Sequence, residues 1–187
     1  DILPPGAVNV ITGGPATGKA LVTHPKVDLI AFTGSTETGR AIASQAGREL
    51  KKVNLELGGI DPFIVFPDAD LDVAVRGVAW ARLLNAGQVC TSSKRIILVE
   101  PIAEEFTRRL LAFVKTLRVG DPMKRDTDIG SIITADAALK VERQVAKAVS
   151  QGAKLLLGGK RMQPKGLKGH FFEPTILTNV RHGSFAT

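Results

Sequence analysis

The stretch VNLELGGIDPFIVF, residues 53–66, holds two apolar runs on either side of a Gly-Gly pair. Residues 53–57 and 62–66 are rich in Val, Ile, Leu and Phe, a composition typical of buried strands in α/β proteins. Gly58 and Gly59 interrupt the apolar pattern, and such a pair ends a strand and lets the chain change direction. The stretch therefore predicts the last strand of one domain, a boundary after Gly58, and the first strand of a second domain.

Strand and helix patterns alternate along the rest of the chain. Further strands are expected at residues 7–11, 29–33, 95–99, 154–157 and 175–178. Helices are expected from about residue 36 and at residues 71–85, 101–117 and 134–152. This order predicts an α/β fold with a largely parallel sheet covered by helices.

Composition excludes several functional classes. The 187 residues are 44% apolar and 23% charged, as in ordinary soluble globular proteins. No apolar run approaches the roughly 18 residues of a membrane span. The net charge of +7 is spread along the chain, and aromatic residues are few, which argues against a nucleic-acid-binding surface. The three histidines are isolated, so no metal site is expected. Neither end carries a start or cap signal, which predicts a partial chain.

Cys90 and Glu56 are candidate catalytic residues. Cys90 lies in LLNAGQVCTSSKR, residues 83–95, among small polar residues, whereas most free cysteines fill apolar cores. Glu56 lies between two leucines at the end of an expected strand, and a carboxylate there is costly to bury without a partner or a function. Thiolate is a good nucleophile, and a carboxylate in partly apolar surroundings is a useful general base.

Two glycine-containing segments are candidates for phosphate binding. GGPATGKA, residues 13–20, nearly matches a P-loop, but Ala20 stands where a magnesium-binding Ser or Thr is required. FTGSTETGR, residues 32–40, follows an apolar strand, and Ser35 is placed to cap the helix that begins at about Thr36. The N–H groups and dipole at such a helix start favour an anion.

Five motifs in order, PPG, GPATG, FTGSTETGR, LELGG and GQVCTS, followed by GDP, GG and FFEPTIL, resemble the aldehyde dehydrogenase superfamily. The resemblance covers essentially the whole chain, which looks like the middle portion of such an enzyme. It implies an α/β fold, three-layered with mostly parallel sheets and present as a partial chain. Residues 1–58 would be the C-terminal part of the NAD(P)-binding domain. Residues 59–187 would be the catalytic domain, incomplete at its C-terminal side.

The resemblance also implies a reaction and its residues. Cys90 would attack an aldehyde to give a thiohemiacetal and then a thioester, and Glu56 would activate the water that releases a carboxylic acid. NAD or NADP would be the cofactor. The cofactor-binding residues implied are Gly14, Gly34, Ser35, Thr36, Gly39 and Leu57. Asn85 is expected to order the loop before Cys90. Some relatives pass the acyl group to coenzyme A, and these lack the glutamate, so Glu56 favours hydrolysis.

The resemblance predicts a cytoplasmic homo-oligomer that acts on a small-molecule aldehyde, without a metal, a nucleic acid or a membrane. The isolated 187-residue chain is expected to be inactive. The backbone N–H of Cys90 can help to stabilise the oxyanion, but the superfamily's second oxyanion donor and the residues that bind the cofactor ribose lie in other segments. Two alternatives stay open. One is a P-loop-like nucleotide-binding protein, and the other is a non-catalytic relative of the same fold.

Overall fold

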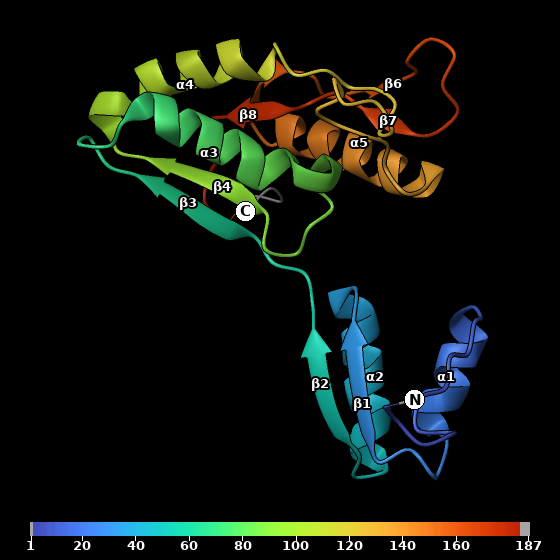
Figure 1. Ribbon diagram of the computed structural model, residues 1–187. Coiled ribbons are helices and arrows are strands. Elements are labelled where there is room, and N and C mark those ends of the chain that lie inside the picture. Colours follow the sequence, from blue (N-terminus) through green and yellow to red (C-terminus); the bar gives the residue numbers. More distant parts are fainter. Residues whose placement is uncertain (1, 184–187) are drawn as a thin grey trace. The chain divides into compact units, whose positions relative to one another are not determined.

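A computed structural model describes residues 2–183, which form two compact units, Asp1–Gly58 and Gly59–Thr187 (Figure 1). The division falls within the glycine pair at which the sequence predicts a domain boundary. Helices and strands alternate, so the predicted α/β class is confirmed. Among the described residues, no helix is long and apolar enough to cross a membrane.

The first unit is built around two parallel strands. Its elements are α1 (Pro15–Thr23), β1 (Leu29–Thr33), α2 (Thr36–Arg48) and β2 (Lys52–Glu56). β1 and β2 pair from Leu29 opposite Lys52 to Thr33 opposite Glu56. α2 connects them and buries Ile42 and Ala46 on one face, as a helical crossover between parallel strands does.

Two predictions for the start of the chain are wrong. Residues 7–11 form no strand, and Val8 and Val10 are 70% and 87% exposed. A strand needs a partner for its backbone N–H and C=O groups, and within residues 2–183 these residues have none. Residues 15–23, expected to include a loop, form the helix α1. Pro15 suits the first position of this helix, because its missing N–H would have no partner there.

The second unit has three helices, a 3₁₀ turn and six strands within its described residues. In chain order they are β3 (Asp61–Val65), α3 (Leu71–Leu83), η1 (Leu84–Gly87), β4 (Ser93–Leu98), α4 (Glu100–Val114), α5 (Ala135–Ser150), β5 (Lys154–Leu157), β6 (Arg161–Met162), β7 (Phe171–Phe172) and β8 (Ile176–Thr178). β3 and β4 are parallel, whereas β5 pairs with β8 and β6 with β7 in antiparallel fashion. The β3–β4 pair, whose strands come before and after Cys90 in the chain, is therefore parallel, as predicted.

The main core of this unit lies between α3, α4 and the β3–β4 pair (Figure 1). Phe106 of α4 is fully buried, and it packs with Val65 of β3 and Val78 of α3. Asp70 begins α3 by accepting hydrogen bonds from the N–H groups of the first helical turn. This packing fixes the end of α3 and the start of β4, which are the two anchors of the segment that carries Cys90.

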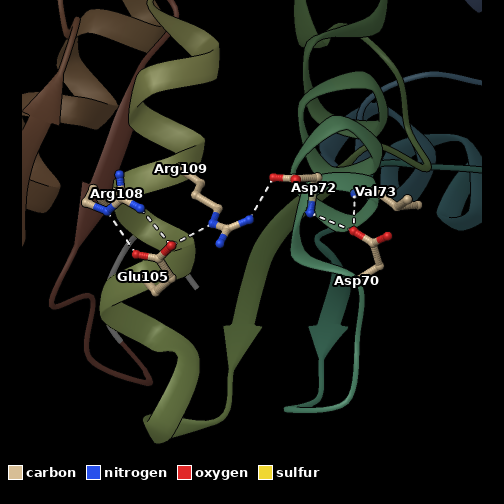
Figure 2. Close-up of polar contacts among 6 residues, drawn as sticks. All are labelled: Asp70, Asp72, Val73, Glu105, Arg108 and Arg109. Atoms are coloured by element: carbon tan, nitrogen blue, oxygen red, sulfur yellow. Dashed lines mark hydrogen bonds and ion pairs between the residues drawn. The ribbon is translucent and has the colours of Figure 1, made fainter.

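A group of surface ion pairs on α4 also reaches α3 through one pair, Arg109 with Asp72 (Figure 2). Arg109 of α4 donates to Asp72 of α3 at 2.8 Å and to Glu105 at 2.7 Å. Arg108 donates to Glu105 at 2.6 Å. Hydrogen bonds from Arg108 and then Arg109 lower the pKa of the Glu105 carboxyl from its usual 4.5 to about 2. A shared carboxylate thus holds two arginines, one of which reaches the neighbouring helix.

We expect Glu105→Gln to lower the thermal midpoint slightly at pH 7, because the folded protein favours the charged Glu105. A depressed pKa contributes stability above pH 4.5, and this contribution disappears as pH falls through about 2. Thermal melts of wild type and variant should therefore differ at pH 7 and converge as the pH falls towards 2. Glu104→Gln is the control, because the exposed Glu104 makes no ion pair within residues 2–183. An equal effect of both variants would contradict this assignment.

Candidate active site

The predicted cofactor loop of the first unit lies at the carboxyl ends of β1 and β2. The Gly34 N–H donates to the Glu56 carbonyl at 3.0 Å, which joins the loop after β1 to the last residue of β2. Ser35 caps α2 by accepting a hydrogen bond from the Thr38 N–H at 3.1 Å. Thr36 is the first residue of α2. The backbone of Glu56 and the start of α2 therefore share one edge of the sheet, where ligands of parallel sheets usually bind.

Gly39 and Leu57 touch across the same edge. A β-carbon at Gly39 would lie 2.5 Å from a methyl carbon of Leu57, which is too close for any other residue without a shift. The glycine therefore lets α2 approach the segment after β2. Six predicted residues of the first unit thus gather in this region: Gly34, Ser35, Thr36, Gly39, Glu56 and Leu57.

Gly14 is the remaining residue predicted to bind the cofactor. It lies before α1 as its N-cap, and it is exposed. The nearby Lys19 belongs to α1. A P-loop needs a non-helical run of backbone N–H groups ahead of its lysine, but here the helix already begins at Pro15. The P-loop alternative is therefore wrong.

An open depression of about 430 Å³ lies at the opposite, amino end of the β1–β2 sheet. Leu29, Leu50 and Lys51 are among the residues that line it. None of the predicted site residues lines this depression. The carboxyl edge, where Glu56 and Ser35 lie, is the better candidate because its helix start supplies N–H groups for an anion.

Cys90 is exposed in a turn of the cysteine loop, which we define as residues 84–92 between α3 and β4. The loop has an uncommon backbone. Asn85, Ala86 and Gly87 have φ angles of 52°, 55° and 76°, three successive residues in the left-handed region. This conformation suits glycine and is tolerated by asparagine, but it is strained for alanine. Surrounding groups must therefore stabilise the loop.

Arg82, in the last turn of α3, forms hydrogen bonds with two residues of the loop, one on each side of Cys90. Its guanidinium donates to the Gly87 carbonyl at 3.0 Å and to the Ser92 hydroxyl at 2.9 Å. Ser92 is buried, and its hydroxyl donates back to the Arg82 carbonyl at 3.3 Å. Burial lowers the pKa of the Arg82 guanidinium. One cation thus joins both ends of the segment that surrounds Cys90.

Gln88 links the loop to the segment that precedes α5. Its side-chain oxygen accepts from the Ile133 N–H at 2.9 Å, and its side-chain N–H donates to the Ser131 carbonyl at 3.3 Å. Two further bonds, at 3.1 and 3.0 Å, run from Gln88 to the Asn85 carbonyl. Asn85 therefore orders the loop through its backbone, in agreement with the role expected for it.

Lys94, at the start of β4, holds the second half of the loop. Its ammonium donates to the carbonyls of Val89, Cys90 and Ser92, each at 3.2 Å. The loop is also approached from the start of the second unit. A β-carbon at Gly59 would lie 3.3 Å from the Cys90 carbonyl oxygen. Cys90 is thus exposed while the backbone around it is held by several neighbours.

The family model described as "Aldehyde dehydrogenase family" matches residues 2–186. The chain belongs to the aldehyde dehydrogenase family. Betaine aldehyde dehydrogenase 1 of Oryza sativa subsp. japonica is 46% identical over 180 residues, which are 95% of this chain and 35% of that protein. A probable succinate-semialdehyde dehydrogenase [NADP(+)] of Sinorhizobium fredii is 43% identical, with coverage of 95% and 36%. The chain therefore spans about a third of the length of these relatives.

Solved aldehyde dehydrogenases have the same fold. A double mutant of betaine aldehyde dehydrogenase from Staphylococcus aureus, in complex with NAD⁺, superposes with a TM-score of 0.94 at 36% identity, over 98% of this chain and 37% of that one. Succinate-semialdehyde dehydrogenase from Burkholderia pseudomallei gives a TM-score of 0.89 at 40% identity, over 98% and 38%. Other relatives are named peroxisomal or chloroplastic aldehyde dehydrogenases.

In this aldehyde dehydrogenase chain, Glu56 belongs to the first unit and Cys90 to the second. Their roles, and those of the predicted cofactor residues, stay predictions. Arg82, Gln88 and Lys94 were not identified from the sequence. The sequence contains one signal for Lys94. A lysine near the start of an apolar strand, four residues after a cysteine, has a side chain long enough to reach the backbone around that cysteine. Within residues 2–183, no group of three or more His, Cys, Asp or Glu side chains could hold a metal.

We expect Ala86→Gly to stabilise the protein by about 0.5–1 kcal/mol. The left-handed conformation costs an L-residue roughly 1–2 kcal/mol, and glycine avoids this cost. Glycine also loses more conformational entropy on folding, which offsets part of the gain in stability. Urea unfolding monitored by the fluorescence of the single tryptophan would measure the difference. Ala81→Gly, in the right-handed helix α3, is the matched control and should destabilise by about 0.5–1 kcal/mol. The same sign for both variants would refute strain at Ala86.

Proposed function

We propose that the protein containing this chain oxidises an aldehyde to a carboxylic acid with NAD or NADP. The observation that carries the proposal is the exposed Cys90 on a loop whose backbone is held by Arg82, Gln88 and Lys94. A buried core cysteine needs no such support. Membership of the aldehyde dehydrogenase family supports this reaction over a non-catalytic role.

The residues at the start of α2 fit a cofactor that carries phosphate. The first N–H groups of a helix have no carbonyl partner within it, and Ser35 and Thr36 add hydroxyl groups there. Glu37, in the first turn, is unfavourable to an anion, but it is exposed and thus screened by solvent. Gly34, Ser35 and Thr36 would hold the diphosphate, Gly39 and Leu57 would lie on the nicotinamide side, and Gly14 near adenine. When bound, NAD(P)⁺ accepts a hydride.

The chain's own residues would act as follows. The Cys90 thiolate adds to the carbonyl carbon of the aldehyde, and a C–S bond forms while the carbonyl oxygen becomes an oxyanion. Loss of hydride from that carbon restores the C=O bond and leaves a thioester on Cys90. Glu56 takes a proton from water, whose oxygen adds to the thioester. The C–S bond then breaks, which releases the acid and the Cys90 thiolate, and Glu56 gives its proton to solvent, so that each group returns to its starting state.

The LELGG and GQVCTS motifs support a shared role for Glu56 and Cys90, since both resemble motifs of the aldehyde dehydrogenase family. We propose that the Glu56 carboxylate is the general base for a thioester on Cys90. A glutamate at this position also favours hydrolysis over transfer to coenzyme A.

The remaining attributes are proposals that rest on the relatives. Their names specify betaine aldehyde, aminoaldehyde and succinate-semialdehyde dehydrogenases, so the proposed substrate is a small-molecule aldehyde. We further propose a homo-oligomer without nucleic acid that acts in the cytoplasm, although the names of some relatives place them in peroxisomes or chloroplasts. Inactivity of the 187-residue chain by itself also stays a prediction.

In the complete natural protein, we expect Cys90→Ala to abolish aldehyde oxidation, because no thioester can form. Glu56→Gln should retain cofactor binding and give one burst of reduced cofactor per active site. Its subsequent turnover should be about 10²-fold slower than wild type, the low end of the effect of a general base. Stopped-flow absorbance of the reduced cofactor measures the burst and the steady state together.

Glu49→Gln is the control for Glu56→Gln, since Glu49 is an exposed glutamate at the end of α2 in the same unit. It should behave as wild type. Wild-type turnover in Glu56→Gln would show that another group activates the water, while turnover in Cys90→Ala would refute the thioester route.

A further inference from the structure

Lys94 uses its full hydrogen-bonding capacity on the cysteine loop. An ammonium group has three N–H donors and no acceptor. Here each donor has a backbone carbonyl at 3.2 Å, on Val89, Cys90 and Ser92. These carbonyls belong to the residue before Cys90, to Cys90 itself and to the second residue after it. A side chain engaged in this way acts through the backbone, because it has no donor left for a substrate.

These three bonds orient the peptide groups around Cys90. In a trans peptide, the C=O of one residue and the N–H of the next point in opposite directions, and no peptide in the described residues is cis. Since the Val89 carbonyl faces Lys94, the Cys90 N–H points away from it. The Cys90 carbonyl also faces Lys94, so the Thr91 N–H points away as well. Lys94 therefore orients two successive N–H groups, the first of them together with the Ser92 N–H, which donates to the Val89 carbonyl at 3.2 Å.

Both N–H groups are available for a ligand. Within residues 2–183, neither the Cys90 nor the Thr91 N–H donates a hydrogen bond to another group. Both residues are exposed, in contrast to the buried Ser92 that follows them. Backbone N–H groups held in advance are the usual means of stabilising an oxyanion, because they need no rearrangement when the charge develops.

The conformation of the cysteine loop is sensitive to replacement of Lys94. Burial lowers the pKa of the Lys94 ammonium, and the charge of Arg82 acts in the same direction, whereas Asp61 and Cys90 oppose both. The loop also contains three successive left-handed residues, which do not maintain their conformation by local preference. Loss of the Lys94 donors would free the Cys90–Thr91 peptide to rotate, whereas the Val89 carbonyl would keep its hydrogen bond from the Ser92 N–H at 3.2 Å.

We propose that Lys94 is a positioning residue that directs the Cys90 and Thr91 N–H groups at the oxyanion formed when Cys90 attacks the aldehyde. This inference rests on the proposed function and adds a residue to it. Lys94 itself does not touch the substrate. Its contribution is to hold two backbone donors in the orientation that addition to a carbonyl requires.

The test compares two reactions of the same thiol in the complete natural protein. Addition to an aldehyde generates an oxyanion, whereas alkylation by iodoacetamide displaces iodide and generates none at the attacked carbon. Lys94→Met keeps a long apolar side chain without donors. We expect its burst of reduced cofactor to be about 10²-fold slower, the low end of the effect of losing one oxyanion donor. Alkylation of Cys90, identified by mass spectrometry, should stay within about threefold of wild type, since no oxyanion forms.

Matched variants complete the experiment. Lys94→Arg retains charge and donors and should recover at least about a tenth of the wild-type burst rate, since a guanidinium can still donate to several carbonyls. Lys115→Met removes an exposed lysine next to α4 and should change neither reaction. If Lys94→Met does not fold, as judged by its thermal melt, Lys94→Gln replaces it. Glutamine keeps two donors on a shorter, uncharged side chain, and it should slow the burst without slowing alkylation.

Two results would overturn the proposal for Lys94, and a third would overturn the proposed function. Equal losses of burst rate and alkylation rate would show that Lys94 only supports the fold around the thiol. A wild-type burst in Lys94→Met would show that Lys94 has no role in the addition step. Absence of any aldehyde oxidation by the wild-type protein would instead overturn the proposed function itself. The failure of the two proposals is therefore distinguishable.

Discussion

Hydrogen bonds from side chains to the backbone of the cysteine loop are the interactions on which the second unit's chemistry depends. The loop passes through three left-handed residues, so local conformational preference does not maintain it. Arg82, Gln88 and Lys94 reach it from α3, from within the loop and from β4. The core between α3, α4 and β4 keeps these anchors in place. An exposed thiol with a fixed backbone is the result.

The first unit achieves a comparable arrangement with regular structure alone. Parallel pairing of β1 with β2 brings Thr33 opposite Glu56, and the helix that follows β1 begins three residues after Thr33. The candidate base and the candidate phosphate site consequently lie at one edge of the sheet. The first unit does contain one left-handed leucine, Leu50 with a φ angle of 54°, but it lies before β2, at the opposite end of the strand from Glu56.

The parts of the molecule that were predictable are those determined by local sequence. Apolar runs predicted β1 and β2 within one residue, and Ser35 was identified as a helix cap. Residues 7–11 were read as a strand for the same reason, yet a strand also requires a partner, which lies outside a local pattern. The role of Gln88 likewise depends on a bond to a position far along the chain, Ile133, and the role of Arg82 depends on how the loop from Gly87 to Ser92 folds back on α3. Sequence motifs indicate Cys90 and Glu56 as candidates, whereas the hydrogen bonds that hold the cysteine loop are visible only in the structure.

The contact between Gly39 and Leu57 has a consequence for how this chain can vary during evolution. The absent side chain at Gly39 leaves room for the isobutyl group of Leu57, the residue that follows the candidate base. A larger residue at position 39 would require the Leu57 side chain to move or to be replaced by a smaller one. The two positions should therefore covary among related sequences, and a designer who enlarges one must make room at the other in the same step.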